Sequence, residues 1–157
     1  MIEIERKYLV TSNAYSSEAF GKEEIIQGFL STHPERTVRV RLTGKKGFIT
    51  VKGKTDPDGT TRFEWEREIS LEEAKSLLEI CEEGVIHKLR YLVKSGSHVV
   101  EVDEFHAENK GLVIAEIELQ HAEESFLKPK WLGVEVTGDP KYYNSQLSKN
   151  PYSSWKK

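Results

Sequence analysis

The sequence predicts a mainly β fold of the α+β class: an antiparallel barrel, closed or nearly closed, with a few helices at its periphery. Eight segments alternate apolar and polar residues with the period of two that a strand requires. They follow one another at fairly even spacing, with one clear helical pattern between the fifth and the sixth. Many evenly spaced strands favour a closed antiparallel barrel over an open sheet.

The predicted strands are residues 2–10, 24–31, 37–43, 47–53, 61–69, 86–94, 97–105 and 112–120. Segment 37–43 shows the alternation most clearly, because Val38, Val40 and Leu42 share one face and two arginines the other. Residues 56–59, Asp-Pro-Asp-Gly, stand between the fourth and fifth segments. Their turn chemistry predicts a hairpin-like link between these two strands.

Helices are predicted at four places. Ser70 and Glu73 fit a capping box, in which each side chain hydrogen-bonds the other residue's backbone amide. The apolar stripe that continues this helix is Leu71, Ala74, Leu77 and Leu78. Shorter helices are predicted within 12–20, 121–127 and 142–147, and another short extended stretch over 130–137.

Composition limits the function classes. The 157 residues are 37% hydrophobic and 31% charged, as in a globular protein, and we expect one domain over 1–157. The net charge of −3 gives no general basic field, which argues against nucleic acid as a partner. The single cysteine, Cys81, excludes an internal disulfide, and no apolar run is long enough for a membrane span. We therefore expect a cytoplasmic protein, a monomer or homodimer, without membrane or nucleic-acid partners.

The charged faces could point to solvent, as in an ordinary sandwich, or into a barrel lumen. Their sorting favours the lumen, because solvated faces usually mix signs within a strand, whereas here whole strands carry one sign. The basic pairs are Arg39 with Arg41 and Lys88 with Arg90, and the acidic pairs are Glu101 with Asp103 and Glu116 with Glu118. A lumen lined by both would hold an anion on one wall and a cation on another.

Nine short motifs, in order along nearly the whole chain, carry a family resemblance. They are Glu3-x-Glu5-x-Lys7, Gln27-Gly28-Phe29-Leu30, Val38-Arg39-Val40-Arg41-Leu42, Thr50-Val51-Lys52-Gly53, Arg62-Phe63-Glu64-Trp65-Glu66, Lys88-x-Arg90-Tyr91, Glu101-Val102-Asp103-Glu104-Phe105, Ala115-Glu116-Ile117-Glu118-Leu119 and Trp131-Leu132-Gly133-x-Glu135-Val136-Thr137. Together they resemble the CYTH family, also called triphosphate tunnel metalloenzymes. The resemblance implies an eight-stranded antiparallel tunnel that binds a triphosphate with divalent metal, and it is greatest to the short bacterial inorganic triphosphatases.

The residues supply the chemistry that such a site needs. Arginine forks and lysine ammonium groups bind phosphate, and carboxylates are the hard oxygen ligands that Mg²⁺ or Mn²⁺ accepts. The predicted triphosphate-binding residues are Lys7, Arg39, Arg41, Lys52, Arg62, Lys88 and Arg90. The predicted metal ligands are Glu3, Glu5, Glu64, Glu66, Glu116 and Glu118, with Asp103 as an outer ligand. The predicted catalytic set is Glu3, Glu5, Lys7, Lys52, Glu116 and Glu118.

The predicted reaction is metal-assisted transfer of the terminal phosphoryl group of tripolyphosphate to water. Common phosphate-binding and hydrolase motifs such as G-x-x-x-x-G-K-[ST] and G-x-S-x-G do not occur in the sequence. Adenylate cyclase and thiamine triphosphatase activities remain alternatives within the resemblance, and a non-catalytic polyphosphate-binding module is a third. Trp65 and Trp131 are expected to pack outside the barrel against helices, which disfavours a nucleotide substrate.

Overall fold

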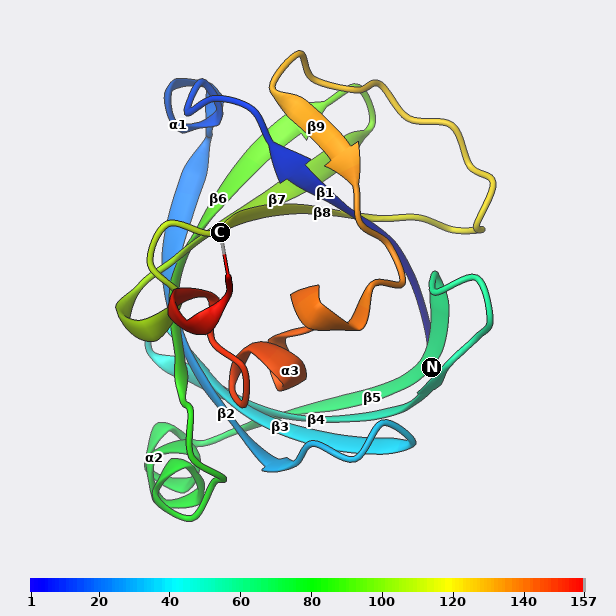
Figure 1. Cartoon of the computed structure of the whole chain (residues 1–157). Coiled ribbons are helices and arrows are strands. Elements are labelled where there is room, and N and C mark those ends of the chain that lie inside the picture. The colour runs from blue at the N-terminus through cyan, green and yellow to red at the C-terminus, as the bar shows by residue number, and fades with distance from the viewer. Residues whose placement is uncertain (157) are drawn as a thin grey trace.

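The computed structural model describes residues 1–156 as one nine-stranded antiparallel sheet with short helices around it (Figure 1). The strands are β1 (Ile2–Val10), β2 (Gly21–Ser31), β3 (Arg36–Thr43), β4 (Lys46–Thr55), β5 (Thr61–Ile69), β6 (Ile86–Ser95), β7 (His98–Phe105), β8 (Val113–Glu118) and β9 (Leu132–Glu135). The α-helices are α1 (Tyr15–Glu18), α2 (Leu71–Glu79) and α3 (Asn144–Leu147). The 3₁₀ helices are η1 (Ala107–Asn109), η2 (Pro140–Tyr142) and η3 (Tyr152–Ser154). None of the helices in this described part of the chain is long and apolar enough to span a membrane.

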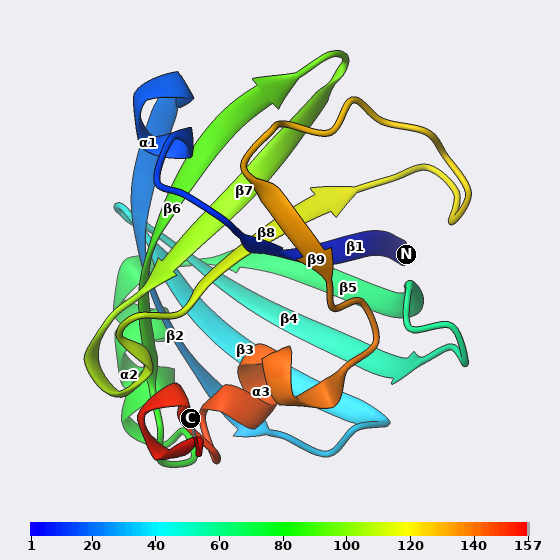
Figure 2. The same ribbon diagram turned by 45° about the horizontal axis from the view of Figure 1, so that its top comes forward.

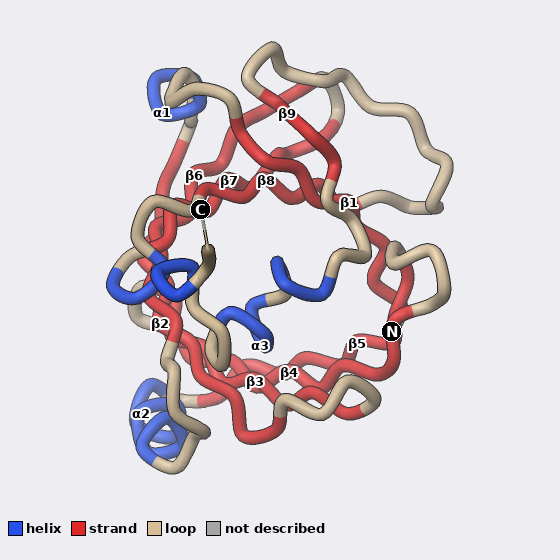
Figure 3. The backbone as a smooth tube through the Cα atoms, in the orientation of Figure 1, coloured by secondary structure: helices blue, strands red, loops and turns tan. Residues whose placement is uncertain are grey.

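The sheet closes into an eight-stranded barrel, as predicted. Its strand order is β5-β4-β3-β2-β6-β7-β8-β1, and the ring shuts where residues 2–4 of β1 pair with 61–63 of β5. Figure 3 shows the strands surrounding a central space. The ninth strand, β9, lies outside the ring and pairs with β1 at its C-terminal half. All eight predicted strands are present, with β2 beginning three residues earlier than predicted.

The outer face of the barrel holds one hydrophobic core. Val100, Val102 and Ile117 alternate with charged residues on β7 and β8, and they are almost fully buried under α1 and the segment before β9. Trp131 packs there, 3% exposed, with its ring edge-on to Tyr15 of α1. The prediction that Trp131 packs outside the barrel against a helix is therefore confirmed. Trp65 is only half-buried, and its ring is covered by the Arg67 guanidinium.

Helix α2 covers the outside of β2, β3 and β4. It begins with the predicted capping box, since Ser70 Oγ accepts from Glu73 N and a Glu73 carboxylate oxygen accepts from Ser70 N. Ala74 is fully buried against β4, where Gly47 lets the helix approach closely. A Cβ on Gly47 would lie 2.6 Å from the Ala74 Cβ, so a larger residue there would push the helix away.

A second hydrophobic core fills one end of the barrel interior. Ile86, Phe105 and Ile114 share the inward face of their strands with charged residues, and they pack against Tyr142 and Leu147 of the C-terminal segment. This segment, orange to red in Figure 2, lies towards one end of the strands. The barrel interior is thus apolar at this end and charged along the rest of its length, which positions the site.

The predicted helix over 121–127 is wrong; those residues form a bend, a turn and irregular backbone. Contacts to distant strands hold the segment open. The Glu124 carboxylate contacts His98 Nε2 of β7, and the Phe126 ring lies edge-on to Tyr8 with 5.9 Å between ring centroids. These tertiary contacts outweigh the weak local preference for a helix.

Candidate functional site

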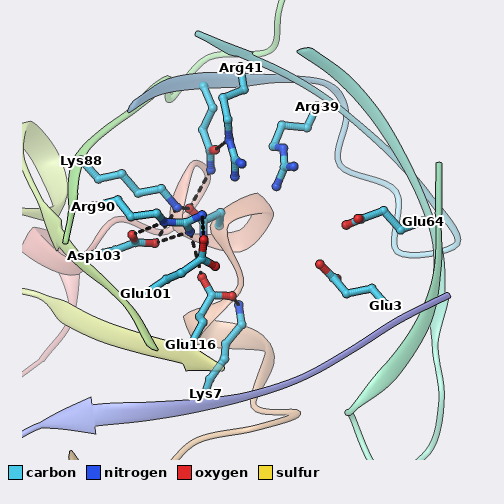
Figure 4. A network of polar contacts seen from close by, with 12 residues as sticks. Glu3, Lys7, Arg39, Arg41, Glu64, Lys88, Arg90, Glu101, Asp103 and Glu116 are labelled. Atoms are coloured by element: carbon cyan, nitrogen blue, oxygen red, sulfur yellow. Dashed lines mark hydrogen bonds and ion pairs between the residues drawn. The ribbon is translucent and has the colours of Figure 1, made fainter. Parts of the chain in front are cut away.

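The thirteen residues predicted as triphosphate-binding, catalytic or direct metal-ligand residues line a single cavity of about 240 Å³ inside the barrel. They are Glu3, Glu5, Lys7, Arg39, Arg41, Lys52, Arg62, Glu64, Glu66, Lys88, Arg90, Glu116 and Glu118. Figure 4 shows Arg39 and Arg41 entering this space from one side and Glu116 and Lys7 from the opposite side. The structure thus brings together what the sequence spreads over more than a hundred residues, while the individual roles stay predictions.

The positive charges form a continuous wall, which we call the basic arc. It consists of Lys52 on β4, Arg39 and Arg41 on β3, and Lys88 and Arg90 on β6. These strands are neighbours in the barrel except for β2, which lies between β3 and β6 and contributes the neutral Gln27. The basic arc therefore covers half of the ring.

The negative charges form the opposing wall, the acidic arc. It consists of Glu101 on β7, Glu116 and Glu118 on β8, Glu3 and Glu5 on β1, and Glu64 and Glu66 on β5. These four strands are consecutive around the ring, since β1 pairs with both β8 and β5. Two cations break the sorting: Lys7 lies within the acidic arc, and Arg62 on β5 donates to the Gly53 carbonyl at 2.9 and 3.1 Å.

A buried ion cluster joins the two arcs where β6 meets β7. Asp103 is fully buried; its oxygens accept from Arg90 Nε at 2.7 Å and Arg90 Nη2 at 2.9 Å, and its Oδ2 lies 2.8 Å from Lys88 Nζ. Arg90 Nη2 also donates to Glu116 at 3.3 Å. Asp103 does not line the cavity; it contacts Lys88 and Arg90 on the side away from the cavity, and its role as an outer metal ligand stays a prediction.

Two lysines contact the acidic arc. Lys52 Nζ lies 3.1 Å from Glu3 and 3.3 Å from Glu64, and Lys7 Nζ lies 3.8 Å from Glu116. Burial tends to lower the pKa of Lys7, but the surrounding glutamates outweigh it and raise that pKa above its ordinary value. Lys7 therefore stays charged within the cavity.

The carboxylates of the acidic arc are crowded together. Burial, followed by the negative charges of Glu116 and Glu3, raises the pKa of Glu5 well above its ordinary value. Burial and a hydrogen bond to Glu3 raise the pKa of Glu64 to about 7, and Figure 4 shows both carboxylates pointing into the same space. Carboxylates held this close favour a cation between them, because without one some of them must stay protonated.

Two arginines of the basic arc keep donors free for an anion. Arg39 is 8% exposed and its Nε is buried with no hydrogen-bond partner, although its Nη2 donates to Thr50 Oγ1 at 3.1 Å and to Glu66 at 3.4 Å. Arg41 Nε donates to the neutral Gln27, and within residues 1–156 no ion pair involves Arg41. Burial and then the neighbouring arginines lower the pKa of Arg41, which marks uncompensated positive charge.

The donor set fits a hard divalent cation that the ligand helps to hold. Among residues 1–156, no three histidine, cysteine or acidic side chains are gathered into a ready-made cage. Mg²⁺ is commonly held by one or two carboxylates, with waters and phosphate oxygens completing its octahedron. The crowded pairs Glu3 with Glu64 and Glu5 with Glu116 supply such carboxylates. The acidic arc therefore fits Mg²⁺ or Mn²⁺ in company with a phosphate ligand.

Sequence reasoning did not identify three polar contacts that lie at or behind the cavity wall. Gln27 is fully buried between Arg41 and Asn144, Asn144 contacts Lys88, and the Tyr143 ring lies 5.2 Å from Lys7 Nζ. One signal was available for Gln27, which is a polar residue in the apolar run that begins at Ile25.

Comparison with known proteins agrees with this geometry. The family model of the CYTH domain matches residues 1–151. A protein from Acetivibrio thermocellus named inorganic triphosphatase is 49% identical over 155 residues, which is 98% of this chain and 97% of that protein. One of the same name from Nitrosomonas europaea is 31% identical over 152 residues, 94% of this chain and 97% of that protein.

Solved structures share the fold. An inorganic triphosphatase structure superposes with a TM-score of 0.64 at 30% identity, covering 93% of this chain and 97% of that one. A protein from Pyrococcus horikoshii superposes with a TM-score of 0.62 at 24% identity, covering 77% of this chain and 81% of that one. The second likeness concerns the fold alone.

Proposed function

The chain belongs to the CYTH family, and from that premise we propose that it is an inorganic triphosphatase. The proposed reaction is divalent-metal-dependent hydrolysis of the terminal phosphate of tripolyphosphate, which gives orthophosphate and pyrophosphate. Its relatives from A. thermocellus and N. europaea carry the name of this activity. The two-sided charge of the cavity supports the same activity.

The observation that carries the proposal is the pairing of the basic and acidic arcs around one cavity. A triphosphate has several negative charges and needs both cationic donors and metal ions when it leaves bulk water. Arg39 and Arg41 have donors free for its oxygens, whereas Lys88 and Arg90 are held in place by Asp103. A site for a neutral or cationic ligand would have no use for such a basic arc.

In the mechanism, the basic arc binds and orients the phosphate chain, and Glu3, Glu5, Glu116 and Glu118 of the acidic arc would hold the metal. When bound, Mg²⁺ or Mn²⁺ neutralises the charge that develops on the phosphate oxygens. A carboxylate of the acidic arc orients the attacking water and takes its proton. The water oxygen bonds to the terminal phosphorus as the phosphoanhydride bond breaks, and pyrophosphate leaves. The bond to the terminal phosphorus is made by water, so no protein nucleophile is required.

The lining of the cavity favours an inorganic substrate. Among the residues that line it, only Phe29 and Tyr143 are aromatic, and Phe29 is 3% exposed. An adenine or thiamine ring would need a larger apolar or stacking surface. Adenylate cyclase and thiamine triphosphatase activities therefore become outcomes of the test.

The test is a substrate panel. The purified protein is incubated with tripolyphosphate, ATP or thiamine triphosphate in Mg²⁺ or Mn²⁺, and phosphate, pyrophosphate and cyclic AMP are measured. We expect phosphate and pyrophosphate from tripolyphosphate, loss of turnover in excess EDTA, and recovery when metal is restored. Faster turnover of ATP or thiamine triphosphate would replace this assignment with the corresponding alternative. Full activity after verified metal removal would exclude the metal-dependent mechanism.

A further inference from the structure

Two neutral amide side chains connect the C-terminal segment to the basic arc. Asn144 Oδ1 accepts from Lys88 Nζ at 3.0 Å and from Gln27 Nε2 at 2.7 Å. Gln27 Oε1 in turn accepts from Arg41 Nε at 2.9 Å. One carbonyl oxygen of Asn144 therefore lies at the junction of two cation contacts, one direct and one through Gln27.

The orientation of both amides is set by their partners. A lysine ammonium and an arginine Nε–H can only donate, so Asn144 must present its oxygen to Lys88 and Gln27 must present its oxygen to Arg41. The Gln27 NH₂ then points to Asn144, whose oxygen accepts it. Because each end of the chain is an obligate donor, flipping either amide would break a contact on both of its sides.

The C-terminal segment gives this arrangement a rigid anchor. Leu147 is fully buried and Tyr142 is 8% exposed in the second hydrophobic core, so the residues on either side of Asn144 are fixed by packing. Asn144 also begins α3, where its backbone carbonyl accepts from Ser148 N at 3.1 Å. A side chain held in this way can place a flexible lysine more precisely than solvent could.

The neutrality of the amides matters as much as their position. Lys88 already contacts the Asp103 carboxylate at 2.8 Å, and a second carboxylate would compensate the charge that a phosphate must meet. An amide oxygen holds the ammonium by a hydrogen bond and leaves its charge available. Gln27 does the same for Arg41, which has a free positive charge in the cavity.

We propose that Asn144 is a positioning residue for anion binding, which aligns Lys88 directly and Arg41 through Gln27. This inference rests on the proposed function, since it assumes that the basic arc binds a triphosphate. It assigns to the C-terminal segment a part in the site beyond filling one end of the barrel.

The test is a double-mutant cycle between Asn144→Ala and Lys88→Met, with Gln146→Ala as a control on the same helix outside the cavity lining. Tripolyphosphate Kd is measured by calorimetry in EDTA, and kcat/KM is measured with Mg²⁺. We expect N144A to raise the Kd about tenfold and to lower kcat/KM about tenfold, the usual effect of losing one charge-assisted hydrogen bond. In the K88M background the same change should cost less than about threefold. Thermal melts verify that each variant is folded.

The outcomes distinguish the positioning role of Asn144 from the proposed triphosphatase activity. Equal losses from N144A in both backgrounds would show that Asn144 does not act through Lys88, and this would overturn the inference. An inactive wild type that still binds tripolyphosphate, with coupling in the cycle, would refute the triphosphatase and retain the positioning role. A wild type that does not bind tripolyphosphate would refute both.

Discussion

Asp103→Asn should lower stability strongly, because it removes the only buried carboxylate that contacts both Lys88 and Arg90 in the ion cluster within residues 1–156. The substitution preserves shape but removes the ion-pair partner of Lys88 and leaves Arg90 with Glu101 and Glu116, at 3.2 and 3.3 Å. Breaking a buried ion pair from one side typically costs about 3 to 5 kcal/mol. At about 2 to 4 °C per kcal/mol for a protein of this size, Tm should fall by about 6 to 20 °C at pH 7.

The pH dependence of the stability difference follows from the direction of the Asp103 pKa shift. Burial tends to raise the pKa of Asp103, but Arg90 and Lys88 outweigh it, so the pKa lies below its ordinary value of 3.8. A lowered pKa means that the carboxylate contributes its stability above pH 3.8 and loses it as the pH falls through the folded-state pKa. The difference in Tm between wild type and D103N should therefore be largest between about pH 4 and about pH 7, where Lys88 is also charged, and shrink below pH 4.

The assay is thermal unfolding followed by circular dichroism, with Glu123→Gln, an exposed acid, as the matched control. The control should stay within about 2 °C of wild type. Tripolyphosphate should raise Tm more in D103N than in wild type, because a bound anion supplies the missing negative charge. A D103N protein as stable as the control at pH 7 would refute the view that this cluster holds Lys88 and Arg90 in place.

Three further predictions address the cavity. Arg39→Ala should lose about 2 to 4 kcal/mol of transition-state stabilisation, measured from kcat/KM. Arg36→Ala, at the exposed start of the same strand, should change kcat/KM little. Equal effects of the two substitutions would contradict a desolvated contact between Arg39 and the substrate. The activity of Glu116→Gln should be partly rescued by high Mg²⁺ or Mn²⁺. Arg41→Gln should lose tripolyphosphate affinity that added metal does not restore. Identical responses of the two variants to metal would show that the acidic and basic arcs do not have separate functions. Burial lowers the pKa of Lys88 to about 7, despite Asp103, so its charge is lost as the pH rises through 7. Metal-free tripolyphosphate affinity should consequently fall more steeply from pH 6 to 8 in wild type than in K88M, and parallel profiles by calorimetry would argue against titration of Lys88.

The strands were predictable because the pattern that defines them is local. In 37–43 the period of two separates Val38 and Val40 from Arg39 and Arg41, and the structure keeps these faces apart. The capping box at Ser70 is local too. The segment 121–127 was mispredicted because Glu124 and Phe126 make their deciding contacts with other strands, and a local pattern carries no information about such contacts.

The site was predictable to the extent that its charges alternate along strands. The sequence alone could not reveal that the Asp103 carboxylate would be paired with both Lys88 and Arg90, because the register between β6 and β7 decides these contacts. Nor could it reveal the contact between Gln27 and Asn144, which are 117 positions apart. Their meeting depends on how the C-terminal segment enters the barrel, a property of the whole fold.

The first strand of the chain depends on partners made much later. Ile2–Ile4 of β1 pair with 61–63, residues 5–9 pair with 114–118, and Tyr8 pairs with Glu135. During synthesis, β1 therefore has no partner along most of its length until β8 has been made. Such distant pairing incurs loop-closure entropy before it gains contacts, so barrel closure should be a late and slow step of folding. Until then the carboxylates of Glu3 and Glu5 lie on an open strand edge, where their charge opposes pairing with other chains.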